Sequence, residues 1–367
     1  MKIAILGTRG IPNNYGGCEA NAEMLSPIFL EKGHDVTVYC SSEHLHQQPT
    51  WNGVELKHIY CPESRFGIWG TLLYDFLCLQ DALKSEFDIV VELGYVPVAL
   101  FYPFFRRRNS LLFTNMDGLE WKRSKWNWLL RKFTLFTEYL GAHYSDALIA
   151  DNIAIQEHLK SAYQQDSYFI AYGAESISKP DPGVLIKYDL QANEFFMLIA
   201  RLEPENNIEM ILEGYCQSES EKIMIVVGST STKFGQQLTR RFSSFEKIRF
   251  LESIYDYADL SSLRWYCSCY FHGHSVGGTN PSLLEAMATN AFIAIHANAF
   301  NETVVGDGAL RFSTAAEVAA IMRRRDFPEK DKFLAGNRQR ITEEYTWENC
   351  AQQHLDAFES EILKCPV

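Results

Sequence analysis

A glycine-bearing turn runs directly into an apolar helix in the stretch HSVGGTNPSLLEAM, residues 274–287. Pro281 suits the first helical turn, and Asn280 or Thr279 can cap it, so the other backbone amides at the helix start remain free. Free amides at the start of a helix attract anions, because they lie at the positive end of the helix dipole. The pattern therefore predicts a site for a negatively charged ligand such as a phosphate.

The side chains around this turn fit such a ligand. Gly277 and Gly278 carry no side chain that would block a close approach to the backbone. Glu285 follows one turn into the helix, where it faces either solvent or a group that bears hydroxyls. His272 and His274 stand just before the turn. Lone histidines are more often structural, but two beside a phosphate turn can bind ligand oxygens.

An arginine occupies the corresponding loop after the first predicted strand of the second half, in ARLEPENN, residues 200–207. The guanidinium of Arg201 can hold a diphosphate through two parallel hydrogen bonds. The alternative is a surface arginine that pairs with Glu203 or Glu205. The first reading places a phosphate contact beside the glycine-bearing turn.

The first half carries its own glycine-rich loop, GTRGIPNNYGGCE, residues 7–19. The loop lacks the spacing of a dinucleotide fingerprint. Gly16 and Gly17 nevertheless allow a close backbone approach just before a helix start. Glu19 can bind sugar hydroxyls or simply favour the helix dipole. The loop is either a flexible turn or a binding loop for a phosphate or a sugar.

Two carboxylates stand in TNMDGLEWKRSKW, residues 114–126, at the end of another predicted strand. A carboxylate beside a glycine at the carboxyl end of a strand is well placed for catalysis. Asp117 is the first candidate for orienting or deprotonating an attacking hydroxyl, and Glu120 is the second. The alternative is that Asp117 caps the helix that follows.

Short β-branched runs alternate with amphipathic stretches along the whole chain, which is typical of parallel sheets crossed by helices. The pattern restarts after the proline-rich segment SKPDPG, residues 178–183. We therefore predict an α/β protein of two Rossmann-like domains that face a cleft, with residues 1–180 in the first and 184–346 in the second. The last helix, within 347–367, is expected to cross back to the first domain.

Composition excludes several classes of function. The formal charge of -12 argues against a nucleic-acid-binding protein. The nine cysteines have no CxxC spacing, so a zinc site or a disulfide framework is not expected. The most apolar run, residues 89–105, is broken by Glu92 and two prolines and reads as a strand and a helix rather than a membrane span.

Three of these motifs, RGIPNNYGGCE, NMDGLEWKRSKW and GGTNPSLLEAM, occur in an order that resembles the GT-B glycosyltransferases of family 4. More narrowly, they resemble the bacterial branch that includes the β-1,4-rhamnosyltransferases of capsule and cell-wall polysaccharide synthesis. The resemblance covers nearly the whole chain. It implies a retaining enzyme that moves a sugar, with L-rhamnose from dTDP-rhamnose as the best guess, to a lipid-linked saccharide acceptor.

The resemblance also implies roles for individual residues. Arg201 would contact the donor diphosphate and Glu285 the ribose hydroxyls. The wider donor site would comprise Gly16, Gly17, Gly277, Gly278, Thr279 and Asn280, and to these we add Asn206 and His272 from their own positions in the sequence. The acceptor site would comprise Glu19 and Asp117.

Two positions depart from the family pattern. Asn206 stands where relatives commonly have a lysine, and Gly277 where they commonly have an acid. The first departure removes a phosphate countercharge, and the second removes a contact to the hydroxyls of the donor sugar. A 6-deoxy donor would fit such a site.

No two aspartates stand two residues apart, so the Asp-x-Asp metal pair of other glycosyltransferases is absent. We predict a metal-independent enzyme without a cofactor, in which the helix start and Arg201 stabilise the leaving diphosphate. The alternatives are a UDP-sugar-dependent hexosyltransferase of the same fold, a nucleotide-sugar epimerase, and an inactive sugar-nucleotide-binding membrane scaffold.

Basic residues alternate with tryptophans in residues 106–132, in contrast to the acidic total. This mixture suits an interfacial segment on an anionic membrane. The alternative is a helix packed on its own domain. We therefore expect a cytoplasmic protein, peripheral at the inner face of the plasma membrane. The predicted membrane patch comprises Arg106, Arg107, Arg108, Lys122, Arg123, Lys125, Trp126 and Trp128.

Overall fold

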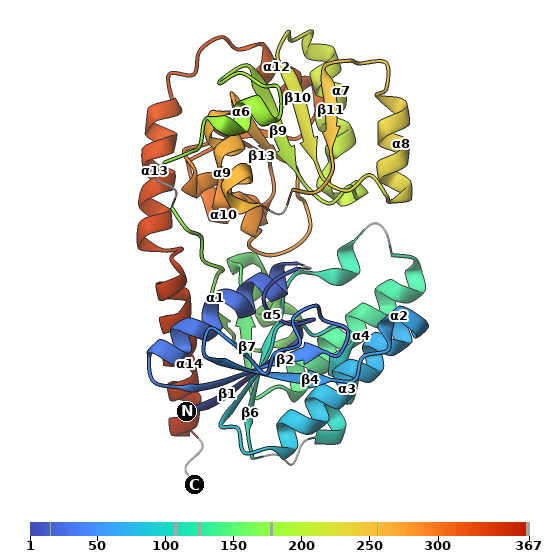
Figure 1. Cartoon of the computed structure of the whole chain (residues 1–367), viewed down its shortest axis with the longest axis vertical. Helices are drawn as coiled ribbons and strands as arrows, with labels where there is room; N and C mark the ends of the chain where they lie inside the picture. Colours follow the sequence, from blue (N-terminus) through green and yellow to red (C-terminus); the bar gives the residue numbers. More distant parts are fainter. Residues whose placement is uncertain (15, 106–108, 124–125, 177–178, 255, 365–367) are drawn as a thin grey trace. The chain divides into compact units, whose positions relative to one another are not determined.

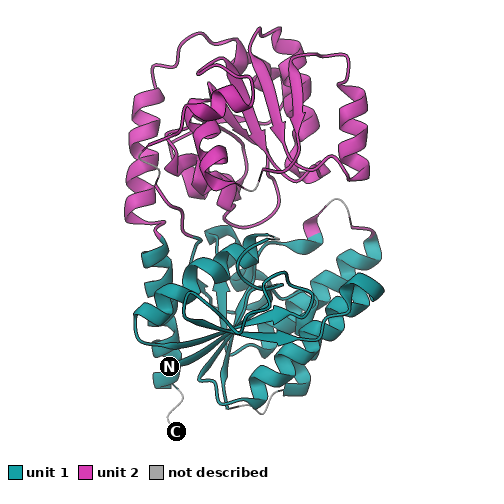
Figure 2. Ribbon diagram, viewed as in Figure 1, with its two compact units in different colours: residues 1–121, 128–172, 347–367 teal, residues 122–127, 173–346 magenta. Residues whose placement is uncertain are grey.

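The computed structural model describes residues 1–14, 16–105, 109–123, 126–176, 179–254 and 256–364. Four residues of the predicted membrane patch, Arg106, Arg107, Arg108 and Lys125, lie outside these ranges. The chain forms two compact units (Figure 2). Unit 1 contains Met1–Trp121, Trp128–Tyr172 and Trp347–Val367, and unit 2 contains Lys122–Asn127 and Gly173–Thr346.

Unit 1 is built on an eight-stranded sheet in the order β3-β4-β2-β1-β5-β6-β7-β8 (Figure 1). All neighbouring strands are parallel except the short antiparallel pair β3 and β4. The strands are β1 (Lys2–Leu6), β2 (Asp35–Ser41), β3 (Thr50–Trp51), β4 (Val54–Ile59), β5 (Ile89–Glu92), β6 (Leu111–Asn115), β7 (Ala147–Ala150) and β8 (Tyr168–Phe169).

The helices of unit 1 follow the apolar periodicity of the sequence. The predicted helix after β7 begins at Asn152, whose Oδ1 accepts a hydrogen bond from the amide of Ala154 at 2.9 Å. The helices are α1 (Gly17–Glu31), α2 (Glu63–Phe66), α3 (Ile68–Lys84), α4 (Trp128–Tyr144), α5 (Ile153–Tyr163) and α14 (Trp347–Lys364), with 3-10 helices η1 (Val98–Phe105) and η2 (Glu120–Lys122).

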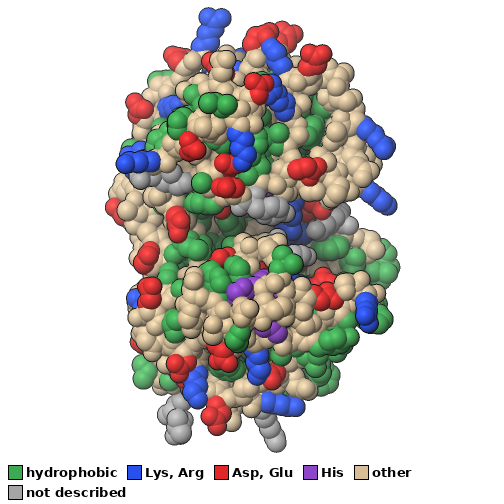
Figure 3. All heavy atoms as spheres, viewed as in Figure 1, with side chains coloured by type: hydrophobic (Ala, Val, Ile, Leu, Met, Phe, Trp, Pro, Cys, Tyr) green, Lys and Arg blue, Asp and Glu red, His purple; other side chains and the backbone are tan. Residues whose placement is uncertain are grey.

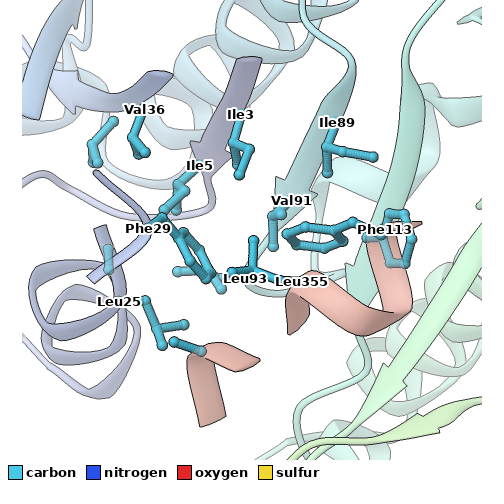
Figure 4. Close-up of a cluster of buried hydrophobic side chains, with 14 of the residues drawn as sticks. Ile3, Ile5, Leu25, Phe29, Val36, Ile89, Val91, Leu93, Phe113 and Leu355 are labelled. Carbon is cyan, nitrogen blue, oxygen red and sulfur yellow. The ribbon is translucent and has the colours of Figure 1, made fainter. Parts of the chain in front are cut away.

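The last helix, α14, belongs to unit 1, as predicted. Its buried face packs on the sheet and on α1 around Leu355 and Phe358 (Figure 4). The ring of Phe358 lies edge-on to Phe113 of β6, with centroids 4.8 Å apart, and 6.1 Å from Phe29 of α1. Burial of side chains of this size contributes roughly 2 kcal/mol each, so α14 is an integral part of this core.

Unit 2 has a six-stranded parallel sheet in the order β11-β10-β9-β12-β13-β14. Its strands are β9 (Phe195–Ile199), β10 (Ile223–Val227), β11 (Ile248–Leu251), β12 (Cys269–His272), β13 (Ile293–His296) and β14 (Leu310–Phe312). The central strands are buried on both faces, which explains their continuous apolar runs.

Helices connect the strands of unit 2. They are α6 (Gly183–Lys187), η3 (Pro204–Asn206), α7 (Ile208–Ser218), α8 (Lys233–Arg241), α9 (Tyr257–Tyr266), α10 (Pro281–Ala288), α11 (Ala299–Val305), α12 (Ala315–Arg323) and α13 (Lys330–Glu343). Among the residues that the structure describes, no helix combines the length and the apolar character needed to cross a membrane.

The chain passes from unit 1 to unit 2 at Tyr172 and Gly173, ahead of the predicted linker at 178–183. Part of that segment is ordered by contacts within unit 2. The amide of Asp181 donates to the hydroxyl of Ser262 at 2.9 Å, and Val184 is buried at the start of α6. The prolines and glycine therefore shape the entry into unit 2.

Each sheet reverses its strand order once, between β1 and β5 in unit 1 and between β9 and β12 in unit 2. Ligands of doubly wound sheets bind outside the carboxyl ends of the strands at such a reversal. The predicted motifs follow these strands directly. The sequence around Asp117 follows β6, next to β5, and Arg201 and His272 mark the ends of β9 and β12.

Candidate functional site

The turn after β12 has the predicted helix start. Asn280 is the N-cap of α10, and its Oδ1 accepts from the amide of Ser282 at 3.0 Å, with Pro281 at the first helical position. Thr279, the other candidate cap, is buried instead. Gly277 has a φ of 135°, a conformation that favours glycine, and a side chain there would meet no neighbouring atom. Backbone conformation, rather than space, requires glycine at this position.

Hydrogen bonds from two sides fix the first part of this turn. On one side, the side-chain amide of Asn207 donates to the carbonyl of Gly273 at 2.8 Å. On the other side, the side-chain amides of Asn298 and Asn301 donate to the carbonyl of His274 at 3.0 and 2.8 Å. Because these anchors come from separate elements, the turn is held in one conformation before any ligand arrives.

The loop after β9 packs closely against this turn. A Cβ on Gly273 would lie 2.1 Å from the carbonyl oxygen of Asn206, so only glycine fits there. The Asn206 side chain is buried, and its Nδ2 donates to the carbonyl of Arg201 at 2.7 Å. One N–H of this amide is therefore committed to the loop, and its second N–H and its oxygen remain for the donor contact predicted for Asn206.

Arg201 is exposed at the end of β9. Glu205, one of the two acids considered as its partner, lies with Oε1 3.8 Å from Nη1 of Arg123. The positive charge of Arg201 contributes to lowering the pKa of His274, after the larger effect of burial. The guanidinium therefore lies beside the turn, as a phosphate contact requires.

His272 and His274 stack on each other with ring centroids 4.4 Å apart. Burial lowers the pKa of His272 well below its usual range. Burial, together with the charges of Arg201 and Arg123, lowers the pKa of His274 to about 3. Within the described parts of the chain, neither ring nitrogen of His272 has a hydrogen-bond partner. Both rings are neutral near pH 7, so they can bind ligand oxygens without adding positive charge.

Glu285 forms an ion pair with a residue that local sequence patterns did not indicate. Its Oε2 accepts a hydrogen bond from Nη2 of Arg264, which comes from α9 and is almost completely buried. Burial lowers the pKa of Arg264, but the charges of Glu285 and Tyr270 outweigh it and raise that pKa overall. The Glu285 side chain keeps 28% of its surface exposed, so it can reach a ligand while Arg264 holds it.

The candidate site of unit 1 contains carboxylates, whereas that of unit 2 contains neutral and positive groups. The thiol of Cys18 donates to the carbonyl of Leu93, just after β5, at 3.2 Å. Burial raises the pKa of this thiol well above its usual range. Four carboxylates raise it further, which places them around the thiol: Asp117, Glu19, Glu92 and Glu120. The structure therefore brings together three predicted acids, Asp117, Glu120 and Glu19, and adds Glu92.

The glycine loop before α1 is organised by one of these acids. Glu19 is buried, and its Oε1 accepts from the amide of Arg9 at 2.8 Å. A Cβ on Gly16 would lie 3.4 Å from Oε2 of Glu19, whereas one on Gly17 would meet open space. One oxygen of Glu19 is therefore used to hold the loop. The predicted contact between Glu19 and the acceptor substrate depends on its other oxygen.

The loop that carries Asp117 and Glu120 is held by a tyrosine. The hydroxyl of Tyr95 lies 3.3 Å from the carbonyl oxygen of Gly118 and accepts from the amide of Glu120 at 3.4 Å. The next helices begin at Glu120 and Trp128, so Asp117 does not occupy the N-cap position of either. The alternative role of Asp117 as a helix cap is therefore wrong.

A buried acid on α4 supports this tyrosine. Glu138 is 1% exposed, and it accepts from Tyr163 at 2.8 Å and from Nε2 of His158 at 2.7 Å. Its second oxygen lies 3.3 Å from the Tyr95 hydroxyl. Burial and the charges of Glu138 and Glu120 raise the pKa of Tyr95 well above its usual range, so Tyr95 stays protonated. Glu138 is an acid within the apolar sequence of α4, and this feature of the sequence could have indicated a buried hydrogen-bond network.

The predicted membrane patch is divided between the two units. Arg123 and Trp126 belong to unit 2, and Trp128 begins α4 in unit 1. The Arg123 side chain is 17% exposed beside Glu205, and Trp126 is partly buried. Arg123 therefore pairs within unit 2, and the membrane patch stays a prediction. Lys122 and Trp128 remain exposed.

Among the described residues, no three histidine, cysteine, aspartate or glutamate side chains come together as a possible metal site. Metal independence stays a prediction.

Comparisons with known proteins extend these observations. Residues 1–175, less than half of the chain, match a family model described as a domain of unknown function, DUF1972. An uncharacterized 42.6 kDa protein in the cps region of Klebsiella pneumoniae is 38% identical over 74 residues. That match spans 20% of this chain and only 19% of the Klebsiella protein.

Solved structures match nearly the whole chain. Sucrose-phosphate synthase from Thermosynechococcus elongatus gives a TM-score of 0.80 at 15% identity, over 99% of this chain and 100% of that one. Anabaena HepE (Alr3699), solved with UDP-glucose, gives 0.77 at 15% identity, over 98% and 100%. A Burkholderia xenovorans trehalose-phosphate synthase, solved with glucose-6-phosphate, gives 0.74 at 10% identity, over 99% and 100%.

The chain has the GT-B fold. The predicted fold class is confirmed. Each of the two α/β units is built on a largely parallel sheet, and the last helix belongs to the first unit. At these identities the likeness concerns the fold, and function depends on the residues described above.

Proposed function

We propose that this protein is a retaining glycosyltransferase that moves a sugar from a nucleoside diphosphate to a saccharide acceptor. The observation that carries the proposal is the arrangement in unit 2, in which Arg201, two neutral histidines and the start of α10 meet where β9 and β12 end. A diphosphate needs positive charge and amide donors at a preformed turn, and this turn provides both.

In this proposal unit 2 binds the donor. Arg201 and the backbone at 277–280 neutralise the diphosphate as negative charge develops on it, without a metal or a cofactor. Glu285, oriented by Arg264, accepts hydrogen bonds from the ribose hydroxyls. Neutral His272 and His274 bind uncharged or partly charged oxygens of the donor.

Unit 1 would supply the chemistry on the acceptor. The carboxylate of Asp117 orients the acceptor hydroxyl, with Glu120 beside it. The acceptor oxygen forms its bond to the anomeric carbon as the bond to the diphosphate breaks. The hydroxyl proton passes to the leaving phosphate or to Asp117. Attack on the face from which the phosphate leaves retains the anomeric configuration.

The proposed donor is dTDP-rhamnose and the proposed acceptor a lipid-linked saccharide. A glycine at position 277 offers no carboxylate to the hydroxyls of the sugar, which suits a 6-deoxy sugar. The Klebsiella relative is described as lying in a cps region, which supports a role in surface polysaccharide synthesis. Such a reaction would occur at the cytoplasmic face of the membrane.

A second candidate donor is a UDP-hexose. HepE was solved with UDP-glucose, and its fold matches 98% of this chain. Under this alternative the ligand's diphosphate contacts are the same, and only the base and the sugar differ.

A donor panel tests the proposal. The protein is incubated with a lipid-linked saccharide and with dTDP-rhamnose, UDP-glucose or UDP-galactose, with and without EDTA, and products are detected by mass spectrometry. We expect a mass gain of one deoxyhexose with dTDP-rhamnose that survives EDTA. A hexose gain would favour the second candidate. Tight donor binding with no transfer to any acceptor would overturn the proposal.

A further inference from the structure

Three neighbouring elements of unit 1 expose large apolar side chains that no part of the proposed reaction uses. They lie at the end of α2 and the start of α3, in η1, and in the first half of α4. Each of the following side chains is more than half exposed: Phe66, Ile68, Trp69, Phe104, Trp128 and Phe136. We call these six residues the apolar face. Isolated exposed side chains of this kind are ordinary, but six large ones on adjoining elements are not.

The three elements form one layer. The ring of Phe76 on α3 lies edge-on to Phe101 of η1, with centroids 4.9 Å apart, and 6.1 Å from Phe105. On its other side, η1 packs against α4. Figure 1 shows α2, α3 and α4 on the same side of unit 1, and Figure 3 shows hydrophobic side chains gathered there. The apolar face is therefore carried by secondary structure that is itself well packed.

Most of the exposed charges beside the apolar face are positive, although the exposed Glu43 accepts hydrogen bonds from Ser64 of α2. Arg65, Arg131 and Lys132 are exposed between its members, and Nζ of Lys132 lies 5.1 Å from the ring centre of Trp128. The acid on α4, Glu138, is buried. Glu63 and Asp75 of α2 and α3 both lie toward Arg9. These described residues contrast with the formal charge of -12 for the whole chain.

We propose that the apolar face inserts into the headgroup region of an anionic bilayer. Tryptophans are favoured at that depth, and the three cations complement anionic headgroups. The proposal goes beyond the transfer reaction, because lipid binding needs neither donor nor acceptor. It also replaces the basic patch expected from the sequence with a surface built mainly from α3, η1 and α4.

Vesicle sedimentation tests the proposal on the full chain. The test variant replaces Trp69, Phe104 and Trp128 with glutamine. The matched control replaces Leu45 and Ile186, each 86% exposed and outside the apolar face, with glutamine. We expect the test variant to lose at least tenfold in affinity for phosphatidylglycerol vesicles, and the control to bind like the wild type. Circular dichroism melting verifies that both variants fold.

A second variant separates charge from insertion. Arg131→Gln with Lys132→Gln should weaken binding to phosphatidylglycerol vesicles several-fold and leave weak binding to phosphatidylcholine vesicles unchanged. Brominated lipids should quench the fluorescence of the wild type more than that of the test variant. Equal sedimentation of the wild type and the test variant would overturn the proposal. So would a wild-type dimer that ignores vesicles and becomes monomeric in the test variant. Neither result depends on transfer activity.

Discussion

The two candidate sites occupy equivalent places in their sheets but have opposite electrostatic character. In unit 2 the end of β12 meets an exposed arginine, neutral histidines and a helix start. In unit 1 the ends of β5 and β6 meet buried and partly buried acids around Cys18. In our proposal the same topology supports a site for an anion in unit 2 and a site for a hydroxyl nucleophile in unit 1. The side chains at the strand reversal, rather than the topology, determine which ligand each unit can hold.

The largest effect is expected in unit 1. Asp117→Asn keeps the size of the side chain and removes its charge, so it should lower the transfer rate about 100-fold or more. Donor affinity should stay within about twofold of the wild type, because the donor contacts lie in unit 2. Single-turnover transfer and calorimetric donor titration measure the two quantities. Near-normal turnover would remove Asp117 from the mechanism.

The next effect is expected in unit 2. Arg201→Ala should raise the dissociation constant for the nucleoside diphosphate by about 10- to 100-fold, since a charge-assisted contact contributes roughly 1.5 to 3 kcal/mol. Arg201→Lys should recover part of the loss. The exposed Arg325 of the same unit provides the control, and Arg325→Ala should bind normally. Equal affinities for all of these proteins would exclude a phosphate role.

A smaller effect separates positioning from catalysis. Tyr95→Phe removes the hydroxyl that holds the loop of Asp117 and Glu120, so kcat should fall about 3- to 10-fold while KM changes little. Tyr163→Phe removes a hydrogen bond that Tyr163 donates to Glu138 and that does not touch this loop, and it serves as the control. Equal losses in both variants would indicate a general packing role instead.

The smallest effect concerns pH. Burial keeps His274 neutral down to a pKa of about 3, so donor affinity should show no histidine titration between pH 5.5 and 8. The unfolded chain binds this proton near pH 6.5, so the stability of the folded state should fall as pH drops below that value. For His274 the loss is roughly 1 kcal/mol at pH 5.5.

Urea unfolding of the wild type and of His274→Asn at pH 5.5 and pH 8 measures this difference. If the free energy of unfolding changed with pH by the same amount in the two proteins, His274 would not be a neutral, buried group.

Local sequence patterns predicted most of the fold. The strands β1, β9 and β10 were recognisable because buried parallel strands are continuously apolar. Short β14 and β3 were not, because two or three residues carry too little pattern to be distinguished from a loop.

The candidate sites were predictable where one local motif suffices. The Asn280 cap and Pro281 at the start of α10 follow from neighbouring residues alone. The pairing of Arg264 with Glu285 was not predictable, because the partners lie on different helices and meet only when the sheet forms. The contact between Tyr95 and Glu138 was not predictable either, because the two residues are 43 positions apart in the sequence.

The division of roles between the two units is the central claim, and calorimetric titration tests it most directly. dTDP and UDP are titrated into the wild type, Arg201→Ala and Asp117→Asn under identical conditions. The account predicts that the wild type and Asp117→Asn bind the preferred nucleotide equally, whereas Arg201→Ala loses at least tenfold in affinity. Nucleotide binding that is lost with Asp117→Asn and kept with Arg201→Ala would contradict it.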